Sequence, residues 1–222
     1  MLAKKIISFY ESLQPPQHLP TGTEVLFPQQ EQQVIKLIKE FYSKYYSDNR
    51  KRTLILGINP GRFGAGATGI NFTAAKQLTE NCGIPHSLKM QSELSAEFIY
   101  EVIERHGGPE AFYSRFFIGA VSPLGYIQNG KNINYYDHRD LEKAVTPFIV
   151  STLQQQLTWN LNREKCICVG EGKNIRFLNK LNREYSFFRE IIPLPHPRFI
   201  LQYRRKQKEE YVLRYLETLQ AV

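Results

Sequence analysis

The sequence predicts an α/β protein, a three-layer α/β/α sandwich with a central four-stranded parallel sheet. Short apolar runs bounded by glycine or charge are typical of buried parallel strands, and four occur, at residues 53–57, 115–120, 165–170 and 188–192. Segments with helical spacing of apolar residues separate them, which implies crossover connections and helices on both faces. In such sheets ligands bind beyond the carboxyl ends of the strands, so we look for a site there.

The helices follow from apolar residues that recur every three to four positions. They are expected at residues 1–13, 30–46, 74–81, 96–106, 137–157, 173–181 and 200–219. We expect Pro147 to kink the fifth of these or to end its first part. Asn134 and Asp137 flank the start of that helix and are expected to cap it.

Length and composition predict one domain over residues 1–222, with a helical part at 1–50 packed on it. No apolar run approaches the ~18 residues of a membrane span, and the first helix is amphipathic, unlike a signal peptide. Three cysteines cannot all pair and are too few for a four-thiolate cluster. Cys166 and Cys168 alternate along a strand, which favours buried packing. We therefore expect a cytoplasmic protein (nucleoid-associated if bacterial) with no membrane partner, metal or cofactor.

The net charge is +8, with a pI near 9.3. A basic surface attracts polyanions through counterion release, and nucleic acid is the commonest such partner. Because many basic proteins bind no polyanion, charge alone leaves this partner open.

A glycine-rich loop follows the first strand. Residues 57–72 contain five glycines, which allow sharp turns and close approach to a ligand, although a mobile loop has the same composition. No Gly-Lys-Ser/Thr follows, so the loop is not a Walker phosphate loop. Residues 64–69 have the Rossmann spacing, but they begin seven residues past the strand, and Ile84 and Pro85 stand where an acidic residue is expected. Dinucleotide binding is therefore disfavoured.

A proline-rich segment follows the fourth strand. The three prolines in residues 193–199 hold the chain extended around His196. An imidazole fixed at a strand end can donate a hydrogen bond to developing negative charge. Taken alone, the segment is more typical of a surface histidine in a proline-rich turn, because histidine has many non-catalytic roles.

Together, these two segments resemble the signature motifs of the uracil-DNA glycosylase superfamily. Residues 57–64 read Gly-Ile-Asn-Pro-Gly-Arg-Phe-Gly and residues 196–198 read His-Pro-Arg. The resemblance is closest to the single-strand-selective monofunctional branch, whose Thr-Gly pair followed by Phe is matched in residues 68–72. The likeness runs from about Leu26 to Leu219.

The resemblance implies a role for each matched residue. Asn59 would hold the attacking water, Phe72 would stack on the flipped base, and His196 would hydrogen-bond the base oxygen. Breaking the base–deoxyribose bond leaves an oxocarbenium-like sugar, which needs water positioned more than deprotonated. A neutral His196 donor facing the anionic base is worth ~3–4 kcal/mol, as for oxyanion holes. The full set of expected base contacts is Ile58, Gly61, Phe63, Phe72, Ala120 and Ser122.

One position departs from the family. The family places an Asn near the end of the second strand to read the uracil edge, and Ala120 stands there in this chain. Base discrimination would then fall to backbone groups, to Ser122 or to the loop shape. Uracil, another deaminated or oxidised base, hypoxanthine and xanthine all remain open.

Cations near both motifs are expected to contact DNA. They are Arg62, Lys131, Arg198, Arg204, Arg205 and Lys206. The alternative for Arg205 and Lys206 is pairing with Glu209 and Glu210 on one helix face.

The interpretation is a monomeric, monofunctional glycosylase that binds single-stranded and possibly duplex DNA with damaged bases. No lysine occupies either motif, which argues against a Schiff-base lyase step. Two alternatives stay open. The first is an inactive nucleic-acid-binding module of the same fold, in which Ala120 in place of the family Asn would reflect the loss of catalysis. The second is an unrelated α/β enzyme acting on a nucleotide or phosphorylated metabolite.

Overall fold

A four-stranded parallel sheet forms the centre of the computed structural model, which describes residues 1–91 and 93–222. The strand order is β3-β2-β6-β7, and all three pairings are parallel. The strands are β2 (Arg52–Gly57), β3 (Phe116–Ala120), β6 (Leu161–Val169) and β7 (Glu190–Leu194). The predicted sheet is therefore confirmed.

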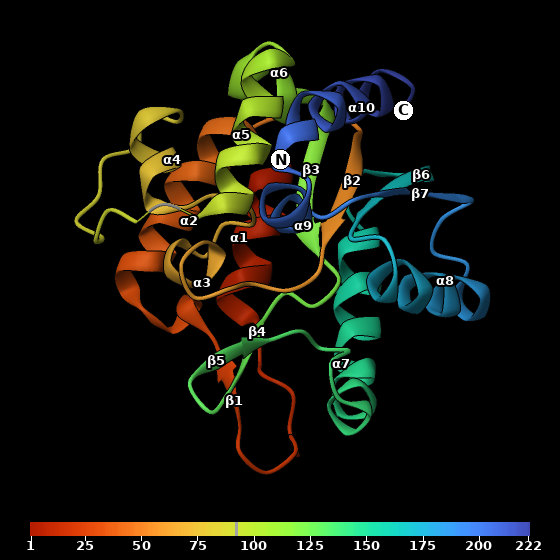
Figure 1. The fold of residues 1–222 in the computed structure, drawn as a ribbon. Helices are drawn as coiled ribbons and strands as arrows, with labels where there is room; N and C mark the ends of the chain where they lie inside the picture. Colours follow the sequence, from red (N-terminus) through yellow and green to blue (C-terminus); the bar gives the residue numbers. More distant parts are fainter. Residues whose placement is uncertain (92) are drawn as a thin grey trace.

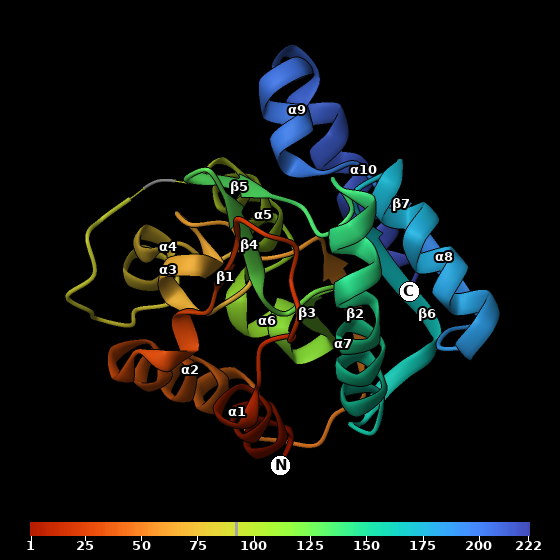
Figure 2. The same ribbon diagram turned by 90° about the horizontal axis from the view of Figure 1, so that it is seen from below.

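Helices cover both faces of this sheet (Figures 1 and 2). One face carries α5 (Leu94–Arg105), α6 (Gly108–Arg115) and α10 (Lys208–Gln220), and the other carries α7 (Arg139–Leu157) and α8 (Lys173–Tyr185). The chain runs from β2 outward to β3 and then back across to β6 and β7. Because crossovers between parallel strands are generally right-handed, this reversal puts the connecting helices on opposite faces. The three-layer prediction is confirmed.

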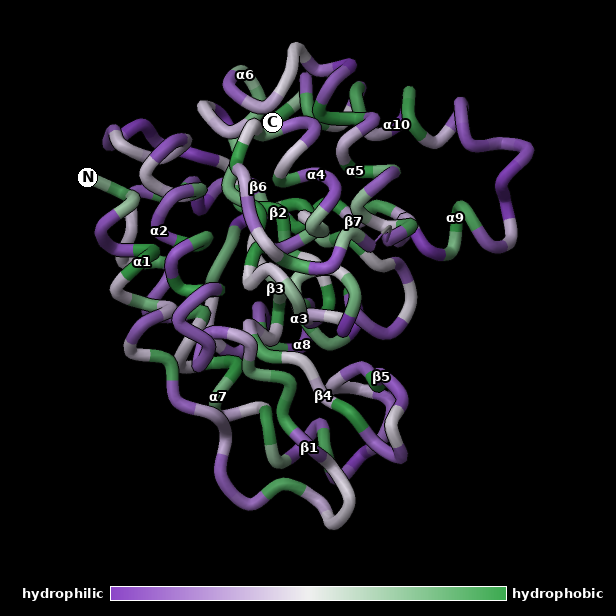
Figure 3. The backbone as a smooth tube through the Cα atoms, turned by 90° about the vertical axis from the view of Figure 1, so that its left-hand side faces the viewer, coloured by the Kyte–Doolittle hydropathy of each residue, from purple (hydrophilic) through white to green (hydrophobic). Residues whose placement is uncertain are grey.

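The N-terminal helices α1 (Leu2–Ser12) and α2 (Gln32–Tyr45) pack against each other, and the end of α2 approaches β3. Aromatic rings make this contact: Tyr42 lies 6.2 Å and Tyr46 5.7 Å from the ring of Phe117. Cys166 and Cys168 are free and buried inside β6, which confirms their packing role. Figure 3 shows the hydrophobic segments gathered at the central strands, while the chain around α9 (Pro197–Tyr203) projects from them.

A second, three-stranded antiparallel sheet was not predicted. It consists of β1 (Thr23–Leu26), β4 (Gly125–Gln128) and β5 (Lys131–Ile133) in the order β1-β4-β5. Each strand has only three or four residues, too few for a periodic pattern to stand out. The short elements η1 (Pro28–Gln30), α3 (Ala65–Thr68) and α4 (Ala75–Glu80) complete the first half of the fold.

Several predicted boundaries were wrong. The last strand runs to Leu194 and includes Pro193, which an edge strand tolerates. The helix expected over 200–219 is two helices, α9 and α10, separated by the 3-10 turn η2 (Arg205–Gln207). Pro147 lies inside α7 without ending it.

The predicted cap of α7 was also wrong. His138 occupies the N-cap without a side-chain bond, while the Asp137 carboxylate accepts from the backbone N–H of Asn134 at 2.8 Å. The pair therefore closes a turn before the helix. No helix in the described ranges is long and apolar enough to span a membrane.

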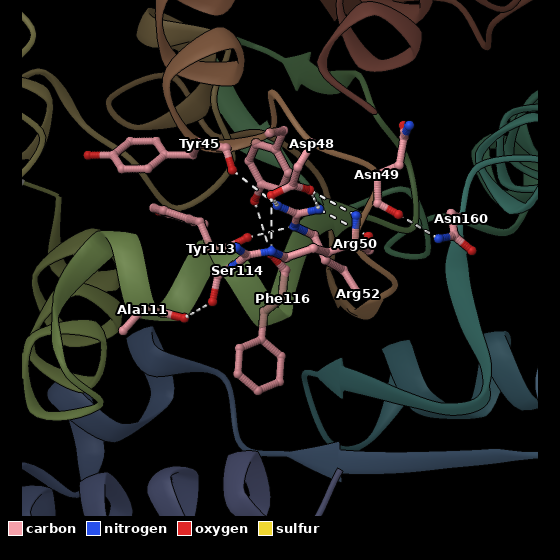
Figure 4. A network of polar contacts seen from close by, with 11 residues as sticks. Tyr45, Asp48, Asn49, Arg50, Arg52, Ala111, Tyr113, Ser114, Phe116 and Asn160 are labelled. Atoms are coloured by element: carbon pink, nitrogen blue, oxygen red, sulfur yellow. Dashed lines mark hydrogen bonds and ion pairs between the residues drawn. The ribbon is translucent and has the colours of Figure 1, made fainter. Parts of the chain in front are cut away.

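A buried arginine closes the amino end of the sheet (Figure 4). The Arg52 side chain is 0% exposed, and its Nε donates to the carbonyl of Tyr113 at 2.6 Å. The other two nitrogens donate to the carbonyl of Tyr45 at 3.2 Å and to Asp48 Oδ1 at 2.7 Å. The hydrogen bond from Arg52 lowers the pKa of Asp48. This network joins the end of α2 to β2 and α6.

Candidate active site

A cavity of about 760 Å³ opens at the carboxyl ends of the sheet strands. Five segments far apart in the sequence line it: the loop after β2, residues 93–95 at the start of α5, the end of β3, residues 131–134, and the chain around His196. Asn59 and His196, predicted to act together, thus share one cavity. The cavity therefore lies beyond the carboxyl ends of the strands, which is the usual position of a ligand site in an open α/β sheet.

The backbone of residues 133–135 holds the amide of Asn59. Asn59 Nδ2 donates to the carbonyl of Ile133 at 3.3 Å, and Asn59 Oδ1 accepts from the N–H of Tyr135 at 3.1 Å. A rotated amide would place two donors against each other and two acceptors against each other, so these partners select one orientation. One lone pair of Oδ1 remains for a further donor.

Phe72 has a φ of +52°, a strained conformation for an aromatic residue. The Thr68 hydroxyl, which bonds the carbonyl of Thr73 at 2.6 Å, closes the loop around it. A Cβ added at Gly57 would lie 2.8 Å from the Phe72 ring, so glycine at the strand end admits the ring. The loop therefore holds the Phe72 ring at the cavity wall in a strained backbone conformation.

His196 lies directly before α9 and caps it. Its Nδ1 accepts from the backbone N–H of Arg198 at 3.2 Å, and its ring centroid is 5.9 Å from that of Phe72. Burial lowers the pKa of His196 to about 4, with the Arg198 charge acting in the same direction. The ring is therefore neutral at pH 7, and because Nδ1 is an acceptor, its single proton is on Nε2.

The remaining expected base contacts divide into two groups. Those that line the cavity are Ile58, Gly61, Phe63, Phe72 and Ala120. Ser122 does not: its hydroxyl is fully buried, donates to the carbonyl of Leu124 at 2.9 Å and bonds the hydroxyl of Tyr126 at 2.9 Å. That prediction was wrong, because the chain turns away from the cavity after β3.

The family model described as Uracil DNA glycosylase superfamily matches residues 43–220. The chain belongs to this superfamily. It is also similar to the crystal structure of wild-type SMUG2 from Pedobacter heparinus, with 45% sequence identity and a TM-score of 0.96. The similarity covers 99% of this chain and 97% of that one. No curated protein matches the chain.

These findings confirm the predicted family and enzyme class: the protein is a DNA glycosylase of the uracil-DNA glycosylase type, and its substrate polymer is DNA. In the part of this glycosylase that the structure describes, no group of three or more His, Cys, Asp or Glu side chains could hold a metal ion.

The cations expected to contact DNA lie at or near the cavity mouth. Arg62, Lys131 and Arg198 line the cavity, and Arg204 lies over the ring of Phe199 at 5.9 Å. Arg205 and Lys206 follow in η2.

The helical ion pairs considered for this segment do not form. Glu209 binds Arg105 of α5 at 2.7 Å instead of Arg205. Within residues 1–91 and 93–222, no ion pair involves Arg205, Lys206 or Glu210. Lys208 binds Glu101 of α5 at 2.8 Å, so two ion pairs connect α10 to α5. Arg205 and Lys206 of η2 are left without an acidic partner among the described residues.

Two aromatic residues of the site were missed. Phe199 and Tyr203 lie four residues apart on α9, line the cavity, and are 43% and 69% exposed. Their ring centroids are 5.8 Å apart. Exposed aromatic residues among cations are typical of single-strand binding surfaces, and the spacing within a basic segment was the available signal.

Proposed function

We propose that this glycosylase removes uracil, or a closely related deaminated or oxidised base, from DNA by direct attack of water on the sugar–base bond. The observation that supports it is the single cavity shared by the oriented amide of Asn59, the ring of Phe72 and the neutral imidazole of His196. Each group matches one requirement of the reaction: a water acceptor, an aromatic face and a hydrogen-bond donor.

The water would be held by Asn59. Its Oδ1 already accepts from the N–H of Tyr135, and its free lone pair can accept from a water molecule. An oxocarbenium-like sugar is electrophilic enough that position matters more than deprotonation. A neutral amide is therefore sufficient, and no basic side chain is required.

The departing base would be stabilised by His196. With Nδ1 occupied by the Arg198 N–H, the Nε2–H is the donor that remains for a base oxygen. No described residue bonds Nε2. A pKa of about 4 keeps this donor neutral, so it stabilises negative charge without titrating near pH 7.

The base would reach the cavity by leaving the stack, which costs least in a single strand. Phe72 would then stack on it, and Phe199 with Tyr203 offers a second aromatic surface at the mouth for neighbouring bases. The cations of the rim and of η2 would bind phosphates.

Base choice is proposed to rest on shape and backbone groups. Ala120 lines the cavity with a methyl group, and the Ser122 hydroxyl is turned away. Without a side-chain amide reading the base edge, the enzyme is expected to tolerate several bases with a hydrogen-bond acceptor facing His196. Uracil, hypoxanthine and xanthine are the bases to compare.

The test is a single-turnover assay on single-stranded DNA with one uracil. Release of free uracil is expected, with strong reductions in Asn59→Ala and His196→Ala and no change in His138→Ala, an exposed histidine outside the cavity. DNA binding without release of any of the three bases would favour a non-catalytic binding module. Neither binding nor release would favour an enzyme acting on a small nucleotide.

A second assay tests whether the enzyme is monofunctional. Lys131 is at the cavity rim, so a lyase step would be trapped by borohydride as a covalent complex that Lys131→Ala abolishes. We expect no complex, an abasic product with an intact strand, and a monomer by light scattering.

A further inference from the structure

The first turn of α8 carries a buried asparagine, Asn174, beneath the catalytic edge of the sheet. Its side chain is 0% exposed. Asn174 Oδ1 accepts from the hydroxyl of Tyr135 at 2.7 Å, and its Nδ2 donates to the carbonyls of Val169 at 3.1 Å and Gly57 at 3.5 Å. A buried amide with its groups bonded on both sides fixes the parts that it joins.

The backbone is shaped to bring Asn174 there. Gly170 has a φ of +125°, and a Cβ at that position would lie 3.2 Å from the Cβ of Asn174. Glycine therefore permits both the turn after β6 and the close approach of α8 to the strand ends.

The partners of Asn174 are also the supports of Asn59. Gly57 is two residues before Asn59 on the same strand end, and the backbone N–H of Tyr135 donates to Asn59 Oδ1 at 3.1 Å. Burial raises the pKa of Tyr135 well above its ordinary value, so its hydroxyl stays protonated and donates to Asn174. One side chain thus connects the segment that carries the amide with the segment that orients it.

We propose that Asn174 is a positioning residue for Asn59 and acts through Tyr135. By holding residues 133–135 against the end of β2, it keeps the Asn59 amide with its oxygen available to the attacking water. A loosened segment would let the amide rotate and present Nδ2, which cannot accept from water. The inference rests on the proposed function, in which Asn59 holds that water.

Removing the Tyr135 hydroxyl tests the link with little disturbance. The Tyr135 ring packs against Phe177 at 4.7 Å and Tyr136 at 4.8 Å, contacts that phenylalanine would keep. The matched control is Tyr46→Phe, which also removes one buried hydroxyl, here bonded to the carbonyl of Phe116 at the amino end of β3, away from the cavity.

The measurement is the single-turnover rate constant for uracil release at saturating single-stranded DNA, with the DNA Kd determined separately. Tyr135→Phe is expected to lower the rate constant about tenfold, as for a slightly misplaced reacting group, without changing Kd. Tyr46→Phe is expected to keep the wild-type rate. In an Asn59→Ala background, adding Tyr135→Phe is expected to cause no further loss, because its effect passes through Asn59.

Three outcomes would overturn the inference: equal rates in Tyr135→Phe and Tyr46→Phe, a loss confined to Kd, or an undiminished loss in the Asn59→Ala background. If Tyr135→Phe no longer melts cooperatively, Asn174→Ser, too short to reach Tyr135, replaces it in the same cycle. A strong Asn59→Ala effect with a silent Tyr135→Phe defeats this inference alone. A wild type without uracil release, or a silent Asn59→Ala, defeats the proposed function and this inference with it.

Discussion

Arg52 at the amino end of the parallel sheet and the pair Asn59 and His196 at its carboxyl end differ in how fully their polar groups are bonded. At the amino end, all three guanidinium nitrogens of Arg52 donate to protein acceptors. At the carboxyl end, Asn59 keeps a lone pair and His196 keeps an Nε2–H facing no described partner. Phe72 adds backbone strain at the same end.

The difference separates a group that stabilises the fold from groups that we propose bind the substrate. A fully bonded buried group such as Arg52 contributes to stability, and its removal leaves carbonyls without donors. A group with an open bonding position contributes little until a ligand fills it. We therefore expect substitutions of Arg52 to change unfolding and those of Asn59 and His196 to change the reaction.

The largest expected effect is on catalysis. Asn59→Ala should lower the single-turnover rate constant about 10²–10³-fold, the usual loss for one preorganised polar group, with DNA affinity retained. The melting temperature should stay near that of the wild type, since the lost bonds lie at an open cavity. A rate within about threefold of the wild type would contradict the role of Asn59.

The corresponding substitution at the amino end is Arg52→Met. It should destabilise the protein by about 3 kcal/mol, because the carbonyls of Tyr45 and Tyr113 lose their buried donor. Chemical denaturation measures the change, and Arg50→Met, an exposed neighbour, is the control with a change within about 0.5 kcal/mol. At temperatures below melting, a reduced uracil release rate in Arg52→Met would break the distinction between the two ends.

The cations at the carboxyl end should make the affinity for DNA depend on the salt concentration. If four of them contact phosphates of single-stranded DNA, log affinity falls with log salt at a slope of about −2.8, from ~0.7 per contact. Arg205→Ala should reduce the magnitude of that slope by about 0.7, whereas Lys180→Ala, exposed on α8, should not alter it. A slope near zero would remove phosphate contact from the proposal.

The smallest expected effect is the response of His196 to pH. Its pKa is depressed from 6.5 to about 4, so uracil release should stay constant from pH 8 to 5 and decline only near pH 4. The unfolded chain binds this proton at higher pH than the folded chain does. The contribution of neutral His196 to the free energy of unfolding is therefore fully present above pH 6.5 and is lost as the pH falls toward 4. An NMR titration of the imidazole with a midpoint at or above 6 would show that the ring is not buried as described.

Much of the fold could be predicted from the sequence, because the central strands are continuous apolar runs. Residues 54–56 of β2 are buried on both faces, which leaves no polar alternation and predicts a parallel strand. The small sheet was not readable, because the pairing of β1 with β4 joins segments about a hundred residues apart. The break between α9 and α10 was also missed: the first turn of α10 makes ion pairs with α5, and local apolar spacing carries no sign of such long-range contacts.

The candidate site shows the same division. Asn59, Phe72 and His196 stand in motifs whose residue types predict the proposed chemistry, and the structure places all three at one cavity. Ser122 was chosen for its hydroxyl and its place near a strand end, yet its bond with Tyr126 turns it inward. Asn174 and Tyr135 carried no local signal, since neither touches the expected base.

By itself, the sequence determined the parallel sheet, the two motif loops at its carboxyl end and the kind of chemistry they serve. These follow from burial patterns and residue types, which are local properties of the chain. Tertiary structure alone decided which polar groups remain unbonded. That outcome depends on partners such as Tyr135 and Asn59, 76 residues apart, which only folding brings within hydrogen-bonding distance.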